Sequence, residues 1–171
     1  MLVGDLVSLH RGQLGQLGPR RGMRRATSAL AWYERGLSLE ATDPAAARAA
    51  YERALAGRPD LADAHNNLGR LLHDAADLAG AERHYRAALA ANDAVALYHF
   101  NLGVVLEDLG RPADAIAAYE RALALEPHLA DAHYNLARQL EAAGRAANDE
   151  LQLRRAVRHL KAYRDLSRKL G

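Results

Sequence analysis

The sequence predicts an all-α fold, an α–α superhelix of about four helical hairpins arranged as a short right-handed solenoid. Two observations carry this prediction. Ala and Leu, which favour helices, are the dominant residues, and only 5% of the 171 residues are aromatic. Similar residues also recur 34 positions apart, as in Leu68, Leu102 and Leu136, which indicates one helical unit copied along the chain.

The copies agree at several positions of the unit. The segments 61–68 and 129–136 differ at a single residue, which chance does not produce. The other sets of identical residues at this spacing are His65, His99 and His133; Asn67, Asn101 and Asn135; Ala47, Ala81 and Ala115; Tyr51, Tyr85 and Tyr119; and Leu55, Leu89 and Leu123. We therefore place repeat units at about 28–60, 61–94, 95–128 and 129–171, the last including a closing helix.

Each unit is expected to contain two helices of about fourteen residues with a short turn between them. In the second unit, Leu68 and Leu72 mark the apolar face of the first helix, and Ala81 and Tyr85 mark that of the second. Pro59 ends the second helix of the first unit. A hairpin of this size cannot bury its apolar face alone, so the units must stack on one another.

Glycine and proline residues mark the turn and the end of the third unit. Gly110 is typical of a helix end, and Pro112 is suited to the first turn of the helix that follows. Pro127 then ends the second helix.

The first and last units depart from this pattern. Trp32 and Gly36 begin a looser copy whose first helix is one residue out of step. In the last unit Ala156 stands seven positions later than expected, so residues are inserted after Gly144. We expect Asn148 and Asp149 to cap a longer closing helix over 150–169. Residues 1–27 match nothing in the repeat and are expected to form an unassigned, flexible N-terminal tail.

The order of residues resembles the tetratricopeptide repeat family, whose pattern is W-x₂-L-G-x₂-Y, then A-x₃-F, then P. The corresponding residues are His65, Leu68, Gly69 and Leu72 with Ala81 and Tyr85; His99, Leu102, Gly103 and Leu106 with Ala115, Tyr119 and Pro127; and His133, Leu136, Ala137 and Leu140. The resemblance covers roughly residues 28–170. It implies a protein–protein adaptor, without catalysis, that binds a peptide or partner helix in a concave groove lined by the first helices.

The same resemblance implies where such a ligand would lie. Asn at the position of residues 67, 101 and 135 often contacts a peptide backbone in this family, and one amide can pair with a peptide unit whatever its side chain. An equally open interpretation is that these amides bond only within the array. The predicted peptide-binding residues are Asn66, Asn67, Arg70, Phe100, Asn101, Val104, Tyr134, Asn135 and Arg138. The basic partners that some members use to clamp a C-terminal carboxylate are missing.

Other chemistry finds little support in the sequence. The chain has no Cys, its few Ser lie outside any nucleophile-elbow sequence, and no phosphate-binding Gly motif occurs. The recurrent His residues lie on successive helices 8–10 Å apart, too far for one zinc ion, and they replace the family's Trp, so we expect them to pack. We therefore predict no enzyme activity, no metal and no cofactor.

Charge distribution suggests an alternative function. Net charge is +4 over residues 1–35, −6 over 36–148 and +4 over 149–171, so an acidic body lies between basic ends. Basic termini are compatible with a regulatory fragment of a bacterial transcription factor that contacts nucleic acid. No signal peptide or apolar span is evident, so we expect a cytoplasmic protein without a membrane partner. Self-association through the array ends is a further possibility.

Overall fold

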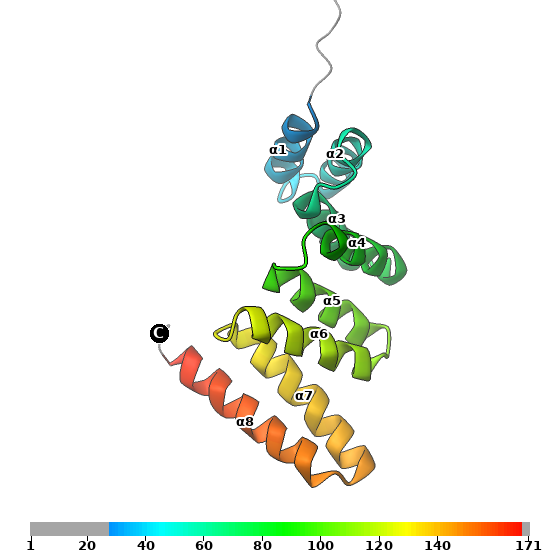
Figure 1. The fold of residues 1–171 in the computed structure, drawn as a ribbon. Helices are drawn as coiled ribbons and strands as arrows, with labels where there is room; N and C mark the ends of the chain where they lie inside the picture. The colour runs from blue at the N-terminus through cyan, green and yellow to red at the C-terminus, as the bar shows by residue number, and fades with distance from the viewer. Residues whose placement is uncertain (1–27, 169–171) are drawn as a thin grey trace, which may run out of the picture.

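The computed structural model describes residues 28–168, which form eight α-helices and contain no strand (Figure 1). The all-α prediction is thereby confirmed. The helices are α1 (Ala29–Leu39), α2 (Pro44–Gly57), α3 (Ala62–Asp74), α4 (Leu78–Ala91), α5 (Ala96–Asp108), α6 (Pro112–Leu125), α7 (Ala130–Ala147) and α8 (Glu150–Ser167). The predicted flexibility of residues 1–27 lies outside the described residues.

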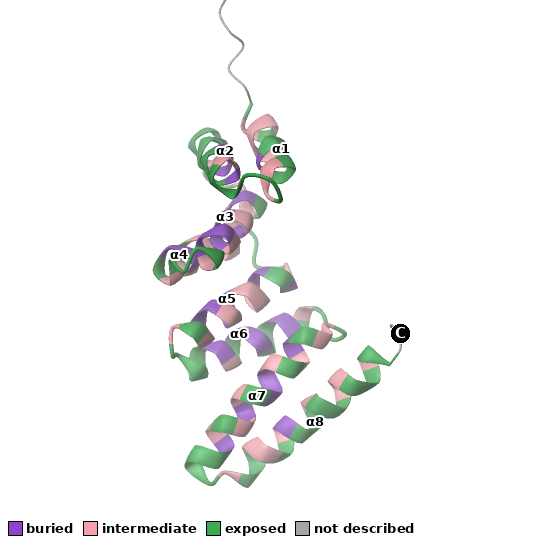
Figure 2. Cartoon of the chain, turned by 180° about the vertical axis from the view of Figure 1, so that it is seen from behind, coloured by how far each residue is buried: buried purple, intermediate pink, exposed green. Residues whose placement is uncertain are grey.

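The helices pair as successive hairpins that stack into a solenoid. The most extensive contacts join α1 to α2, α3 to α4, α5 to α6 and α7 to α8, and smaller contacts join each hairpin to the next. Figure 1 shows the four hairpins following one another along the long axis of the molecule. Buried residues lie on the helix sides that face neighbouring helices, and exposed residues lie on the outer sides (Figure 2).

A tyrosine from the second helix packs onto a glycine of the first helix in three hairpins. A Cβ added at Gly69 would lie 2.8 Å from Cε1 of Tyr85, and one added at Gly103 would lie 2.5 Å from Cε1 of Tyr119. Glycine is therefore needed at these positions because the ring occupies the space of a side chain. The fourth hairpin has Ala137 instead, and the corresponding residue of α8 is Leu160, which is 38% exposed.

The hairpin turns follow from local sequence. Gly110 has a φ of 70° between α5 and α6, where a left-handed residue reverses the chain, and Pro112 begins α6 as predicted. Ala76 holds the same conformation between α3 and α4, with a φ of 61°. An alanine pays a steric penalty there that glycine avoids, so the two turns differ in strain.

The residues inserted in the last hairpin lengthen its helices. Helix α7 has 18 residues, whereas α3 and α5 have 13 each. Asn148 ends α7 in the left-handed conformation, and the Asp149 carboxylate accepts hydrogen bonds from the amides of Leu151 and Gln152 at the start of α8. The predicted cap is confirmed, and it lets the chain turn between the two longer helices.

Candidate functional site

The first helices of the four hairpins present one continuous stripe of side chains, which we call the first-helix face. Residues three or four positions apart share one side of a helix, and each first helix contributes four such positions. The face consists of Leu30, Tyr33, Leu37 and Glu40; Asp63, Asn66, Arg70 and His73; Leu97, Phe100, Val104 and Glu107; and Asp131, Tyr134, Arg138 and Glu141. It contains six of the nine predicted site residues, and Asn67, Asn101 and Asn135 lie beside it.

Side chains on this face bond from one hairpin to the next. Arg70 Nη2 lies 2.5 Å from Glu40 Oε2, which joins α3 to the C-terminal end of α1. Arg138 Nη2 lies 3.3 Å from Glu107 Oε1 and joins α7 to α5 in the same way. The predicted contact residues Arg70 and Arg138 are thus each neutralised by a glutamate of the preceding unit.

Side-chain contacts also join α3 to α5, the first helices of the second and third hairpins. His73 Nε2 lies 2.6 Å from Asp108 Oδ2, and the Tyr98 hydroxyl donates a hydrogen bond to Asp63. These bonds link first helices directly, so the face is one surface rather than four separate ones.

Asn66 is less accessible than its predicted contact with a peptide would require. Its side chain is 4% exposed, its Nδ2 donates to Asn67 Oδ1 at 3.2 Å, and its Oδ1 accepts from Asn101 Nδ2 at 2.8 Å. A buried amide whose groups are bonded to neighbouring amides positions those neighbours instead of meeting a ligand. Direct contact through Asn66 is therefore corrected to a supporting role.

The other three asparagines are only partly buried. Nδ2 of Asn67 and Nδ2 of Asn135 each lie 3.4 Å from a tyrosine hydroxyl, those of Tyr51 and Tyr119, at the long limit for a hydrogen bond. Within residues 28–168, Oδ1 of Asn101 and Oδ1 of Asn135 accept no protein hydrogen bond. The intramolecular and peptide-contacting interpretations of these amides are therefore compatible, because each keeps hydrogen-bonding capacity.

Large apolar side chains are exposed on the same face. Leu37, Leu97 and Tyr134 are 45%, 48% and 42% exposed. Phe100 packs against Tyr119 with ring centroids 5.9 Å apart and is partly buried. The predicted site residues omit Leu37 and Leu30, because the first unit is out of step with the others; aligning α1 on Gly36 would have placed both.

The tyrosines beneath the face are held as neutral hydrogen-bond donors. The Tyr51 hydroxyl donates to Glu40 Oε1 at 2.5 Å, and the Tyr119 hydroxyl donates to Glu107 Oε2 at 3.2 Å. Burial, together with these carboxylates, raises the pKa of both tyrosines well above the ordinary value. Each carboxylate is thereby fixed in orientation toward the arginine that it pairs with.

Two histidine pairs lie between the helices of the second and fourth hairpins. His65 and His84 have their Nδ1 atoms 2.9 Å apart, and the Nε2–H of His65 donates to the Pro59 carbonyl at 3.0 Å. His133 and His159 repeat this geometry, with Nδ1 atoms 2.8 Å apart. Packing and hydrogen bonding account for these rings. Across the described residues, no three His, Asp or Glu side chains form a group suited to a metal ion.

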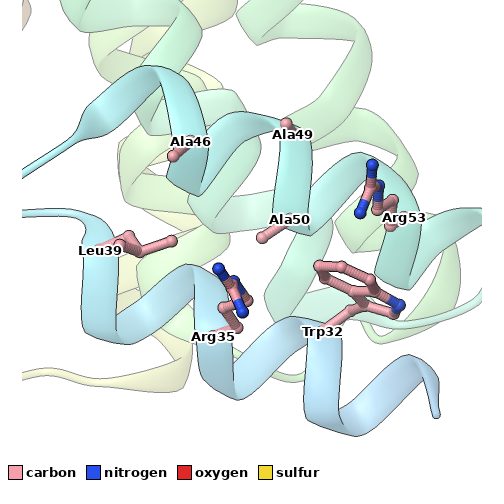
Figure 3. A pocket seen from close by; sticks show the side chains of 7 residues that line it. All are labelled: Trp32, Arg35, Leu39, Ala46, Ala49, Ala50 and Arg53. Carbon is pink, nitrogen blue, oxygen red and sulfur yellow. The ribbon is translucent and has the colours of Figure 1, made fainter. Parts of the chain in front are cut away.

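A small hollow at the N-terminal end of the array was not among the sequence predictions. It has a volume of about 240 Å³ and opens between α1 and α2 (Figure 3). Trp32 lines it, with Cζ of Arg53 4.5 Å and Cζ of Arg35 5.8 Å from the ring centroid. Its volume is below the 300–1,000 Å³ typical of small-molecule pockets, so it is the weaker candidate.

The basic end of the chain is partly neutralised in the described residues. On α8, Arg154 pairs with Glu150 at 2.6 Å, Arg155 pairs with Glu120 of α6, and Arg164 lies 3.0 Å from Asp165. The basic residues of 1–27 and Lys169 lie outside the part that the structure describes. Of helices α1 to α8, none combines the length and the apolar character needed to cross a membrane.

Comparisons with known proteins agree with this architecture. Models of the tetratricopeptide repeat match residues 37–96 and 96–129. No curated protein sequence matches the chain. Among solved structures, a crystal structure of MamA superposes with a TM-score of 0.74 at 20% identity, covering 84% of this chain and 80% of that one. MamA 41-end from Desulfovibrio magneticus RS-1 gives a TM-score of 0.71 at 21% identity, covering 84% and 78%. The first repeat domain of Spaghetti (RPAP3), bound to the HSP90 peptide SRMEEVD, gives 0.66 at 23%, covering 68% and 94%.

Proposed function

The chain belongs to the tetratricopeptide repeat family, and from that premise we propose that it is a non-catalytic adaptor whose first-helix face holds a segment of a partner protein. This family fold supports a protein–protein interaction scaffold. The finer proposal concerns the surface used, the first-helix face, and the compartment, which we expect to be the cytoplasm.

One observation carries the choice of surface. Leu37, Leu97 and Tyr134 are nearly half exposed on three of the four first helices, and of these Tyr134 also packs its ring against that of Tyr163 on α8, with centroids 5.1 Å apart. Such side chains, surrounded by polar groups that retain hydrogen-bonding capacity, are typical of sites that anchor a partner. The carbonyl oxygens of Asn101 and Asn135, which accept no hydrogen bond from residues 28–168, add acceptors for a peptide backbone.

The alternative role with nucleic acid has less support. Three of the cations on α8 are already paired with carboxylates, so their charge is partly neutralised toward phosphate. Val157 is 66% exposed among them, and an apolar side chain adds nothing to phosphate contact. The protein-binding role accounts for the exposed apolar side chains and the asparagine amides of the first-helix face, and the nucleic-acid role does not.

Capture of partners from a lysate tests the proposal when variants of the two surfaces are compared. The intact chain is set beside Leu97→Asp and beside a triple variant with Asn67, Asn101 and Asn135 changed to Ala. We expect both variants to lose the partner, because a buried charge and missing amides each weaken the contact by about 1–3 kcal/mol.

The matched control is Val157→Asp, which places the same charge at an exposed apolar position of α8. Circular dichroism is used to check that each variant is folded. Retention of the same partner by both face variants, with loss in Val157→Asp, would move the interaction to the C-terminal end and sink the proposal.

A further inference from the structure

The first-helix face alternates in character from one hairpin to the next. Helices α1 and α5 present apolar side chains at their first three face positions, whereas α3 presents Asp63, Asn66 and Arg70 at the same positions. Helix α7 repeats the charged ends of α3 but has Tyr134 between them. The face therefore has two apolar bands, over α1 and over α5, with a polar band between them.

Carboxylates border these bands. The acids of the face and its edges are Glu40, Asp63, Asp74, Glu107, Asp108, Asp131 and Glu141, and its arginines are Arg70, Arg138 and Arg145. Arg70 pairs with Glu40, and Arg138 pairs with Glu107. Arg145 Nη2 lies 2.6 Å from Glu141 Oε1.

The net charge of this surface is therefore about −4 with His neutral, and four aspartates contribute to it, of which Asp74 lies 3.5 Å from Arg70 and Asp108 lies 2.6 Å from His73. Asp63 and Asp131 lie at the N-terminal ends of their helices, and Asp74 and Asp108 lie at the C-terminal ends. Both edges of the face are thus acidic, and a cationic ligand would be attracted from either side.

The spacing of the apolar bands sets a length for the ligand. Packed helices lie about 8–10 Å apart, so α1 and α5, with α3 between them, are about 16–20 Å apart. An extended chain advances about 3.3 Å per residue, and therefore spans the two bands in five or six residues. The carbonyl oxygen of Asn101, on α5 at the second band, suits an extended backbone, which has amide groups free to donate.

We infer that the partner segment is an extended, cationic peptide that carries two apolar side chains about six residues apart and Lys or Arg around them. This inference rests on the proposed function and specifies its ligand. The apolar side chains fit beside Leu37 and Leu97, and the cations meet the aspartates at the edges. An acidic segment is repelled. In this respect the face differs from the first repeat domain of Spaghetti (RPAP3), whose bound peptide SRMEEVD contains acidic residues.

Fluorescence anisotropy with three labelled peptides of equal length tests the inference. The reference peptide has two Leu about six residues apart with flanking Lys; the second has adjacent Leu; the third has Glu in place of Lys. We expect the Glu peptide to bind the full chain at least about tenfold more weakly, and the adjacent-Leu peptide about fivefold more weakly. Binding of the reference peptide should weaken as salt is raised.

Protein variants then locate the peptide. Asp63→Asn combined with Asp131→Asn should weaken the reference peptide several-fold and reduce its salt dependence, whereas Asp60→Asn, an exposed change outside the face, should not. Leu37→Ser combined with Leu97→Ser should remove most binding, whereas Val157→Ser should not.

The outcomes separate the two proposals. If the Glu peptide binds as tightly as the reference and still depends on Leu37 and Leu97, the cationic inference is wrong and the face remains the site. If the reference peptide binds without dependence on those leucines, the site itself is wrong. Failure of all three peptides to bind overturns the inference, and the capture experiment then decides the proposed function by itself.

Discussion

The second and third hairpins share one scaffold and differ in what they add to it. Each has a first helix of 13 residues and a second of 14 residues. Each packs a tyrosine onto a glycine, Tyr85 onto Gly69 and Tyr119 onto Gly103. The positions that hold the two helices together are therefore the same in both.

The differences lie on the first-helix face and at one position where the two helices of a hairpin meet. Where the third hairpin has Ala118 opposite His99, the second has His84 opposite His65, and only the second forms a histidine pair. The third hairpin also has Phe100 on the first-helix face, where the second has Asn66. A repeat of this kind keeps its packing residues constant, so its binding chemistry can vary unit by unit.

The largest expected effect concerns the buried tyrosines. Replacing Tyr85 or Tyr119 by Ala should cost about 3–5 kcal/mol in either hairpin. The hydroxyls separate the two: that of Tyr119 bonds to Glu107 and Asn135, whereas that of Tyr85 makes no hydrogen bond to the described residues. Tyr119→Phe should therefore cost about 1 kcal/mol and Tyr85→Phe only a few tenths, as measured by urea unfolding. Equal costs would contradict the comparison.

A smaller effect is expected at the turns. Gly110→Ala should destabilise the third hairpin by about 1 kcal/mol, because alanine is strained at a φ of 70°. Ala76→Gly should stabilise the second by about 0.5–1 kcal/mol, since it relieves the same strain. Thermal unfolding measures both changes. Destabilisation by Ala76→Gly would show that the left-handed alanine is not a cost in this turn.

The smallest effect depends on pH. Burial lowers the pKa of His84 below 6.5, and nearby His65, Arg83 and Arg48 add to this, while Glu52 opposes it. Burial also lowers the pKa of His159, with His133, Arg155 and Arg158 adding and Glu120 opposing. The unfolded chain then binds protons more readily. The contribution of both pairs to the free energy of unfolding is therefore fully present above pH 6.5. It is lost as the pH falls from 6.5 through the pKa of the folded state.

The third hairpin supplies the control for this effect. Changing His84 and His159 to Ala reproduces the His99–Ala118 arrangement at both pairs, so the free energy of unfolding should vary less with pH below 6.5. The measurement is urea unfolding at several pH values. A variant that loses stability on acidification as steeply as the intact chain would show that other groups are responsible.

Much of the fold could be predicted from the sequence, because packing positions recur and recurrence is visible without a structure. The cap at Asp149 and the turn at Gly110 followed from local residue chemistry in the same way. Asn66 could not be placed correctly, since its burial depends on Asn101 of the next unit. The two histidine pairs also arise between helices, and a spacing rule within one helix does not show them. Leu37 was missed for a different reason, because the first unit is one residue out of step with the others.

Photocrosslinking tests the central claim, that the first-helix face holds the partner, most directly. A photoreactive amino acid is introduced in place of Leu97 in one variant and in place of Val157 in another, and each is irradiated with the reference cationic peptide. Both positions are exposed, so each variant should fold. We predict a crosslink from position 97 and none from position 157. A crosslink from 157 alone would place the ligand on α8 and contradict the claim.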